Sequence, residues 1–239
     1  MGVYNTAQFP ADISTKLDDI IAYINSLDGM SADAATHEGY TGFYFYFDGT
    51  SIIGFYGYQD AMHNVHLWLK NGDTYLISPW TSDNIYGAQE QMIVHSYVDE
   101  NLTLLSFRDL QLFRSGMEVA LLTIDASTKL IGYARNISTD NPPSTFLDIS
   151  TLTFENISDV TRQPLTYTNM FPYAAPAGTL DFLAKGYFVN NGVRKYTSEF
   201  MKECSTVNLL STASLPYPLN NHLAIGAHCI VPLDDEGGE

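Results

Sequence analysis

The stretch GFYFYFDGTSIIGFYGY, residues 42–58, decides the fold class of this chain. Phe43, Phe45 and Phe47 alternate with Tyr44 and Tyr46, and this period of two residues is that of a β-strand with two different faces. We expect the phenyl rings to face a core. The tyrosines combine an apolar ring with a polar hydroxyl, so we expect them on a surface that is wet or shared with a partner.

The residues after this strand predict a hairpin. Asp48-Gly49 is a turn signal, and residues 51–58 then return as the partner strand. Gly54 and Gly57 in the returning strand indicate a β-bulge or a close approach between backbone and neighbouring atoms.

Two more hairpins are predicted by Asn-Gly dipeptides between alternating runs. In VHLWLKNGDTYLI, a two-residue turn at Asn71-Gly72 would pair Trp68 with Tyr75 and Leu67 with Leu76. In GYFVNNGVRKY, the turn falls on residues 191–192. The runs QMIVHSYV, LTLLSF, MEVALLTI and KLIGYARNI add strands about every 8–12 residues, a spacing typical of a sandwich or barrel.

The segment ADISTKLDDIIAYINSLDGM, residues 11–30, has the period of a helix instead. Its apolar residues recur at alternating steps of four and three: Ile13, Leu17, Ile20, Ile24 and Leu27. Asp12 or Ser14 can cap its start, and Gly29 suits its end. The stripe Leu17, Ile20 and Ile24 packs either on the same domain or on another copy, and the pattern leaves both open. The polar run SADAATHEG that follows is interpreted as a connector.

These patterns predict a mainly β protein, an antiparallel β-sandwich or barrel-like fold with one short N-terminal α-helix. Pro142-Pro143 cannot join a strand ladder and indicates a boundary. We therefore expect an N-terminal helical segment at residues 1–30, a β-rich domain at 40–140, and a second β-rich segment or domain at 146–239.

Composition excludes several classes of partner. The 239 residues can bury a core without a metal or disulfide. With 11 Lys+Arg against 27 Asp+Glu, the net charge of −16 opposes binding to nucleic acid or to an anionic membrane. No apolar run is long enough for a transmembrane helix. The first ten residues lack the features of a signal peptide, so we expect no signal-directed secretion, with Cys204 and Cys229 as reduced thiols.

Known catalytic motifs are missing from the sequence. It has no Gly-x-Ser-x-Gly and no phosphate-binding glycine loop. His63 and His66 lie in a strand pattern, where residues three apart point to opposite faces. His37-Glu38 is not followed by the second histidine of a zincin motif. We therefore interpret the histidines as structural or surface residues and expect no metal, no cofactor and no enzymatic activity.

One enzymatic or binding alternative stays open. A β-sandwich glycosidase needs only two carboxylates in a groove, and the acidic residues offer many pairs. Trp68, Tyr75 and Trp80 would then be the rings on which a sugar stacks. This alternative is a glycan-binding or glycan-cleaving β-sandwich module.

The last 50 residues run from GYFVNNGVRKY through a Cys-Ser-Thr stretch to HLAIGAHCIVPLDD. This segment resembles the C-terminal part of β-rich structural proteins of tailed bacteriophages. The resemblance implies a non-enzymatic virion protein, an accessory head, collar or tail component assembled in the host cytoplasm. Its partners would be other copies of itself and other virion proteins. The interface residues that we expect are Tyr44, Tyr46, Tyr56, Tyr58, Leu17, Ile20 and Ile24.

Overall fold

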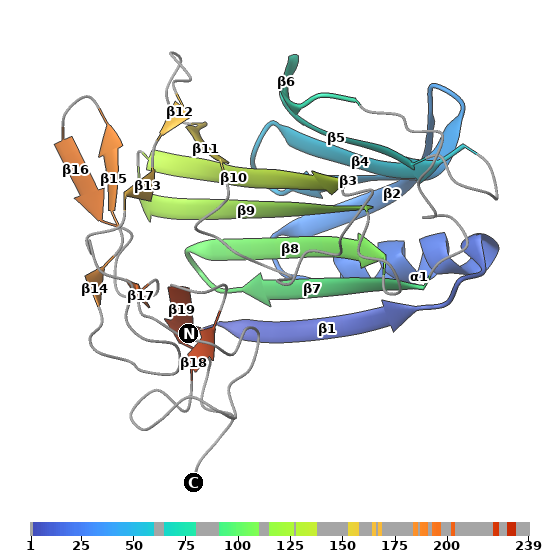
Figure 1. Ribbon diagram of the computed structural model, residues 1–239, viewed down its shortest axis with the longest axis horizontal. Helices are drawn as coiled ribbons and strands as arrows, with labels where there is room; N and C mark the ends of the chain where they lie inside the picture. The colour runs from blue at the N-terminus through green and yellow to red at the C-terminus, as the bar shows by residue number, and fades with distance from the viewer. Residues whose placement is uncertain are drawn as a thin grey trace, which may run out of the picture.

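Two antiparallel sheets and one helix make up the larger part of the described structure (Figure 1). The computed structural model describes the following residues: 2–59, 65–79, 91–109, 115–126, 128–137, 153–157, 164–165, 167–168, 184–185, 187–190, 193–196, 202–203, 222–224 and 229–232. The predicted mainly β, sandwich-like fold with one short helix is confirmed.

The five-stranded sheet is a meander in which each strand pairs with the next one in the chain. Its strands are β2 (Met30–His37), β3 (Tyr40–Phe47), β4 (Ile52–Tyr58), β5 (Val65–Asn71) and β6 (Thr74–Ile77). Phe43, Phe45 and Phe47 are buried on its inner face, whereas Tyr44 and Tyr46 stay partly exposed on the outer face. The alternation predicted for residues 43–47 is therefore confirmed.

The β3–β4 hairpin turns where the sequence indicates. The backbone N–H of Thr50 donates to the carbonyl of Phe47 at 3.2 Å, so Asp48 and Gly49 are the central residues of the turn. Gly49 has a φ of 69°, a value that favours glycine. Within β4 the pairing with β3 has no bulge.

The two glycines of β4 instead allow aromatic rings to lie against the backbone. A Cβ on Gly54 would overlap the ring of Phe45, and one on Gly57 would meet the ring of Phe55 at 2.6 Å. Of the two expectations for these glycines, a bulge or a close approach, the structure has the close approach.

The β5–β6 hairpin differs from its predicted register. Asn71 pairs with Thr74 and Lys70 with Tyr75, so the turn falls on Gly72 and Asp73, and the register shifts between Leu69 and Lys70. The predicted turn at Asn71-Gly72 and the pairs Trp68–Tyr75 and Leu67–Leu76 are therefore wrong.

The reason for this register lies in the neighbouring turn. Asn71 is buried, and its side-chain oxygen accepts a hydrogen bond of 2.5 Å from the hydroxyl of Ser51. The N–H of Gly72 donates to the carbonyl of Ser51 at 3.0 Å. These bonds hold Asn71 in the strand and move the turn one residue along the chain.

The seven-stranded sheet combines the N-terminus with later strands. Its order is β1 (Val3–Phe9), β7 (Met92–Val98), β8 (Leu102–Asp109), β9 (Ser115–Asp125), β10 (Thr128–Ile137), β11 (Thr153–Asn156) and β12 (Pro164–Leu165). The strand β1, which the sequence analysis missed, is an edge strand with mixed polar and apolar residues. The sheet continues past the expected boundary near residue 140, because β11 pairs with β10. Residues 138–145 lie outside the described ranges.

The C-terminal strands form two small sheets, on the left of Figure 1. One contains β13 (Tyr167–Thr168), β15 (Tyr187–Asn190) and β16 (Val193–Tyr196), and the other contains β14 (Ala184–Lys185), β17 (Lys202–Glu203), β19 (Cys229–Pro232) and β18 (His222–Ala224). Asn190 pairs with Val193, which leaves residues 191–192 as the connection. The third predicted hairpin is therefore confirmed.

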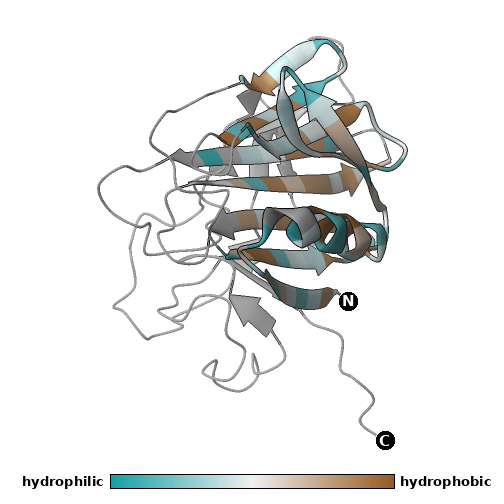
Figure 2. Ribbon diagram, turned by 90° about the vertical axis from the view of Figure 1, so that its right-hand side faces the viewer, coloured by the Kyte–Doolittle hydropathy of each residue, from teal (hydrophilic) through white to brown (hydrophobic). Residues whose placement is uncertain are grey.

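The core lies between the inner faces of the two large sheets. Phe107 of β8 brings its ring centroid within 5.9 Å of Phe43, 5.2 Å of Phe45 and 6.0 Å of Tyr56. In Figure 2, hydrophobic and hydrophilic residues alternate along the strands, as expected for sheets with a buried inner face.

The helix α1 (Ile13–Asn25) begins as the sequence predicts. The N–H of Lys16 donates to the carbonyl of Asp12 at 3.0 Å, which places Asp12 in the N-cap position. After Asn25, hydrogen bonds between residues three apart carry the turn on to Leu27, and Gly29 follows with a φ of 71°. No helix in the described part of the chain is long and apolar enough to cross a membrane.

The apolar stripe of α1 packs inside its own chain. Leu17, Ile20 and Ile24 are at most 8% exposed and belong to the same core as Phe43 and Phe107. Their predicted role as contacts with another copy is therefore corrected, because the two sheets already cover them. Of the two alternatives left open by the sequence, the structure has packing on the same domain.

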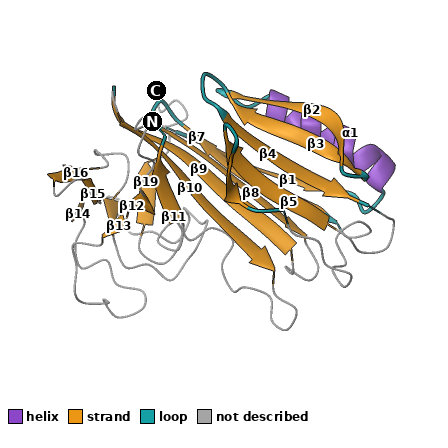
Figure 3. Ribbon diagram, turned by 90° about the horizontal axis from the view of Figure 1, so that it is seen from above, coloured by secondary structure: helices purple, strands orange, loops and turns teal. Residues whose placement is uncertain are grey.

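α1 links the two sheets at one side of the sandwich (Figure 3). The hydroxyl of Tyr23 lies 2.8 Å from that of Ser96 in the seven-stranded sheet. On the other side, the side-chain amide of Asn25 donates to the carbonyl of Ala32 at 2.9 Å and accepts from its N–H at 2.8 Å. Ala32 belongs to β2, the edge strand that was interpreted as a polar connector because its outer residues are small and polar.

Replacing Asn25 by alanine is expected to lower the free energy of unfolding by about 1–3 kcal/mol, because both backbone groups of the buried Ala32 lose their partner. Urea unfolding followed by circular dichroism measures the change. Ser26→Ala is the control, since its exposed hydroxyl only donates back to the carbonyl of Tyr23. Equal stability of Asn25→Ala and the native protein would contradict the role of Asn25 in satisfying the backbone of the edge strand β2.

Candidate functional site

The outer face of the five-stranded sheet carries three tyrosines that are at least partly exposed, Tyr44, Tyr46 and Tyr75. Across β2 to β5, one row consists of Asp33, Tyr44, Phe55 and Trp68. The next row consists of Ser31, Tyr46, Ile53 and Lys70, with Tyr75 of β6 opposite Lys70. We call Tyr44, Tyr46, Ile53 and Tyr75 the tyrosine patch, because each of these side chains keeps part of its surface open to solvent.

Two tyrosines predicted as interface residues lie on the opposite face. Tyr56 and Tyr58 are 0% and 2% exposed, and the hydroxyl of Tyr58 donates to that of Tyr56 at 2.9 Å. The ammonium of the buried Lys16 lies 4.9 Å from the centre of the Tyr58 ring. Their predicted contact with a partner is corrected, because alternation along β4 turns both side chains into the core.

Of the two rings of the glycan alternative that the structure describes, one is open to solvent. Trp68 is 3% exposed, so its indole cannot stack on a sugar in this conformation, whereas Tyr75 is 37% exposed. The two rings touch edge to face, with centroids 5.9 Å apart. Trp80 lies outside the described residues.

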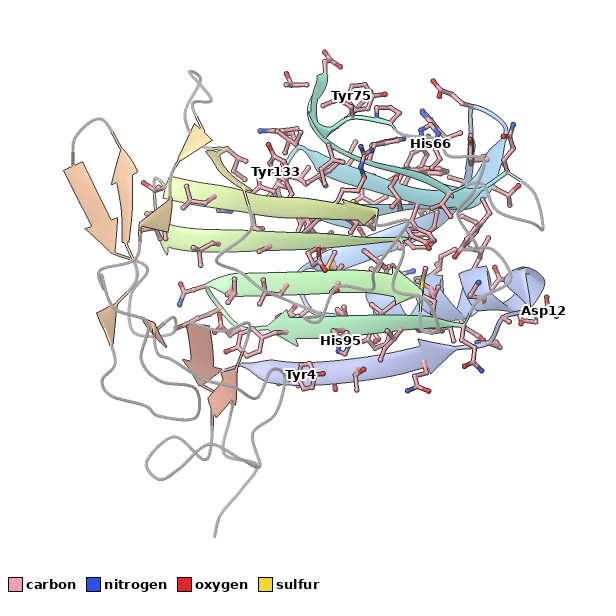
Figure 4. The ribbon with its side chains drawn as sticks, viewed as in Figure 1. Tyr4, Asp12, His66, Tyr75, His95 and Tyr133 are labelled. Carbon is pink, nitrogen blue, oxygen red and sulfur yellow. The ribbon has the colours of Figure 1, made fainter. Side chains whose placement is uncertain are left out.

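A second cluster of rings on the outer face overlaps the tyrosine patch at Tyr44, and most of its members are buried. We call it the histidine–aromatic cluster, and its members are His37, Tyr40, Tyr44, Phe55, His66 and Trp68. The ring of His37 lies 5.1 Å from Trp68 and 5.6 Å from His66, and Tyr40 lies 4.6 Å from His66. Figure 4 labels His66 and Tyr75 in this part of the molecule.

Small residues in the middle of the sheet make room for the two histidines. Gly42 of β3 pairs with Gly57 of β4, and Gly57 pairs with His66 of β5. Since Gly57 has no side chain, the ring of Phe55 lies over it, and the rings of His37 and His66 pack against Phe55 with centroids 5.3 and 5.9 Å away. The ring of His37, at the end of β2, can therefore approach His66 although two strands separate them.

The turn that carries Glu38 is strained. His37 pairs with Tyr40, so Glu38 and Gly39 form a two-residue turn with φ values of 50° and 85°. This left-handed conformation suits Asn-Gly, whereas for a glutamate it costs about 1–2 kcal/mol. Strained residues of this kind concentrate at functional sites.

Several nitrogen atoms of the cluster are buried without a hydrogen-bond partner. They are Nε2 of His37, both ring nitrogens of His66 and Nε1 of Trp68. Each such atom costs about 1–3 kcal/mol. Burial lowers the pKa of His66, and the nearby charges of His37 and Arg135 lower it further, while the carboxylate of Glu38 raises it. We therefore expect a neutral imidazole at pH 7.

His37, Glu38 and His66 bring their metal-ligating atoms within 4.8 Å of one another, the one such group of three in the described part of the chain. Nε2 of His37 lies 4.0 Å from Oε1 of Glu38, and Nε2 of His66 lies 3.9 Å from Oε2. Sequence reasoning missed this group because it compared His66 with its neighbour His63, which lies outside the described residues. The Glu-Gly turn after His37 was the available signal.

A row of polar side chains lies on the outer face of the seven-stranded sheet, where Figure 4 labels Tyr4 and His95. Neighbouring strands place Ser106 between His95 and Glu118. The hydroxyl of Tyr4 lies 2.8 Å from Nδ1 of His95, and Ser106 donates to Glu118 at 3.5 Å. These residue types occur in hydrolase triads, but a triad needs the histidine between the hydroxyl and the acid. In this row the serine lies between the histidine and the acid instead.

An acidic hollow of about 200 Å³ lies beside the β7–β8 turn. Asp28, Asp48, Asp99 and Glu100 contribute its carboxylates, and no aromatic side chain lines it. Asp99 accepts hydrogen bonds from Tyr97 and from the backbone of residues 101 and 102, so it stabilises the β7–β8 turn. The hollow therefore lacks the stacking ring that the glycan alternative requires.

Comparisons with protein-family models, with curated proteins and with solved structures found no match for this chain. The fold defines the class as an antiparallel β-sandwich with one helix at its side.

Proposed function

We propose that this protein is a non-enzymatic structural subunit that assembles with further copies of itself through the tyrosine patch. The observation that carries the proposal is the position of Tyr44, Tyr46, Ile53 and Tyr75 side by side on an outer sheet face, each partly exposed. Tyrosine is enriched in protein interfaces, because its ring buries a large apolar area and its hydroxyl still finds a partner.

The ionisable groups of the tyrosine patch are compatible with its burial against another copy. Burial raises the pKa of Tyr46, and the charges of Asp33 and Tyr44 raise it further, so its hydroxyl is protonated at physiological pH. Lys70 lies against Tyr75, with its ammonium 4.3 Å from the ring centre. The net charge of −16 makes whole copies repel one another, and salt weakens that repulsion.

The assembly that we propose is a tailed-phage particle, in which the protein is an accessory head, collar or tail component. Support for this step comes from the sequence resemblance of the last 50 residues alone. Other virion proteins would then be its further partners, and it would join the particle in the host cytoplasm.

We expect light scattering on the purified chain to give a defined oligomer, at an integer multiple of 26.6 kDa, that persists or strengthens as salt is raised. The double variant Tyr46→Ser/Ile53→Ser should shift the mass towards the monomer, because it removes apolar area from the centre of the patch. Electron microscopy of the oligomer would test the particle assignment, with closed rings or tubes as the expected result.

Val3→Ser is the matched control for this experiment. Val3 is 50% exposed on β1, in the other large sheet, so its replacement removes apolar area without touching the tyrosine patch. A native chain that is monomeric at every concentration would contradict self-assembly. A double variant with the native mass would contradict the role of the patch.

A further inference from the structure

We propose that His37, Glu38 and His66 bind a divalent transition-metal ion of the zinc type, at the end of the histidine–aromatic cluster. Two imidazoles and one carboxylate are a common donor set for such ions. This inference does not rest on self-assembly through the tyrosine patch, although Tyr44 belongs to both.

The distances between the donor atoms are close to those of a metal site. In a tetrahedral zinc site with bonds of about 2.1 Å, two ligand atoms lie about 3.4 Å apart. Here the carboxylate oxygens of Glu38 lie 4.0 Å from His37 Nε2 and 3.9 Å from His66 Nε2. These separations are too long for hydrogen bonds. The three ligand atoms lie within 4.8 Å of one another, so the widest pair would have to close by up to about 1.4 Å through side-chain rotation to surround one ion.

A neighbouring tyrosine orients the first histidine. Nδ1 of His37 lies 2.9 Å from the hydroxyl of Tyr44. When Nδ1 donates to that oxygen, the lone pair of the ring is on Nε2, the nitrogen that faces Glu38 and has no hydrogen-bond partner. Metal-binding histidines are held in this way by a hydrogen bond from their other nitrogen.

The ring nitrogens of the second histidine have no hydrogen-bond partner among the described residues. The side chain of His66 is 2% exposed, and neither of its ring nitrogens has a hydrogen-bond partner. A buried imidazole without any partner is rare in folded proteins, and a bound ion would satisfy it.

The strain at Glu38 has an explanation in the same site. Asparagine or glycine at position 38 would fit the φ of 50° better, but neither would bring a carboxylate between the two histidines. Glutamate at position 38 therefore supplies a carboxylate to the site but destabilises the turn.

A metal ion at this place would connect the β2–β3 turn to β5 across the two strands between them. Three protein ligands leave one position of a tetrahedral ion for water or another small ligand. The side chain of Glu38 is 63% exposed, so the ion would meet solvent on this side while the rings of Phe55 and Trp68 close the other.

Calorimetric titration of the full-length, chelator-treated protein with ZnCl₂ tests the proposal, and we expect one ion per chain. Co²⁺ should give visible d–d absorption of a nitrogen and oxygen site and quench the fluorescence of Trp68. The variant Trp80→Phe makes Trp68 the only tryptophan, so that quenching reports on this place alone. A thermal melt with and without ZnCl₂ should show a higher midpoint with the metal.

Two variants and one control locate the site. His66→Phe keeps a ring in the cluster and should weaken Zn²⁺ binding about tenfold or more. Glu38→Asn should weaken binding similarly while it raises the melting temperature of the metal-free protein, because asparagine relaxes the turn. Glu100→Gln removes an exposed carboxylate elsewhere and should bind as the native chain does.

Two results would overturn the proposal. One is a native chain that binds no Zn²⁺ at a one-to-one ratio. The other is native affinity in both His66→Phe and Glu38→Asn, which would place the bound ion elsewhere in the chain. The metal-free melting temperature shows whether each variant is folded, so lost binding cannot be mistaken for lost structure.

Discussion

Replacing Phe107 by alanine is expected to lower the free energy of unfolding by about 3–5 kcal/mol, a large part of the roughly 5–15 kcal/mol of a typical domain. Phe107 is 0% exposed and is the ring through which β8 contacts Phe43, Phe45 and Tyr56 of the other sheet. Its removal would leave a cavity between the two sheets, because three large rings cannot all move into the empty space.

Urea unfolding followed by tryptophan fluorescence measures this change. Phe107→Leu is the graded control and should lose less stability, because leucine fills most of the space. If Phe107→Ala lost under about 1 kcal/mol, the two sheets would not be packed through this ring.

Replacing Gly42 by alanine should lower the free energy of unfolding by about 3 kcal/mol or more. An added Cβ would overlap the carbonyl oxygen of Tyr56 and the Cα of Gly57, both backbone atoms of the neighbouring strand β4. Backbone atoms inside a sheet cannot rotate away as a side chain can, so β3 and β4 would have to separate. The row that brings His37 and His66 together would separate with them.

Thermal unfolding of Gly42→Ala beside Thr41→Ala checks this expectation. Thr41 is the exposed neighbour on β3, and its replacement should change the stability by no more than about 0.5 kcal/mol. Equal melting temperatures for the two variants would contradict the close approach at Gly42.

The sequence predicted correctly those elements that depend on residues close together in the chain. The alternation over residues 43–47 gave the correct inner and outer faces, and the step of four and three gave the helix and its buried stripe. The edge strands β1 and β2 were missed because few of their residues are buried: only Phe9 in β1, and only Met30 and Ala32 in β2.

The register of the β5–β6 hairpin could not be predicted from its own residues, because a contact from elsewhere in the fold decides it. The turn of β5–β6 is displaced because Ser51, in a different turn, holds Asn71 and Gly72. The same is true of the histidine–aromatic cluster. His37 and His66 come from strands that are not neighbours, and their meeting depends on the pairing of four strands.

Whether a residue contacts its own chain or another is also a property of the whole fold. Leu17 and Tyr58 have the chemistry of an interface, but their partners are residues of the same core. Tyr44 and Tyr46 differ from them only in facing outward, and their role between copies stays a prediction.

The pairing of β1 with β7 has a consequence for the order of folding. The contact between Tyr4 and His95 joins positions 91 residues apart, whereas β2 to β6 pair only with their neighbours in the chain. On the ribosome, the five-stranded meander can form as soon as it has emerged, but β1 has no partner until β7 is made. β1 therefore emerges before β2 to β6 but pairs only after they have been made, and its unpaired edges stay open to other nascent chains during that wait.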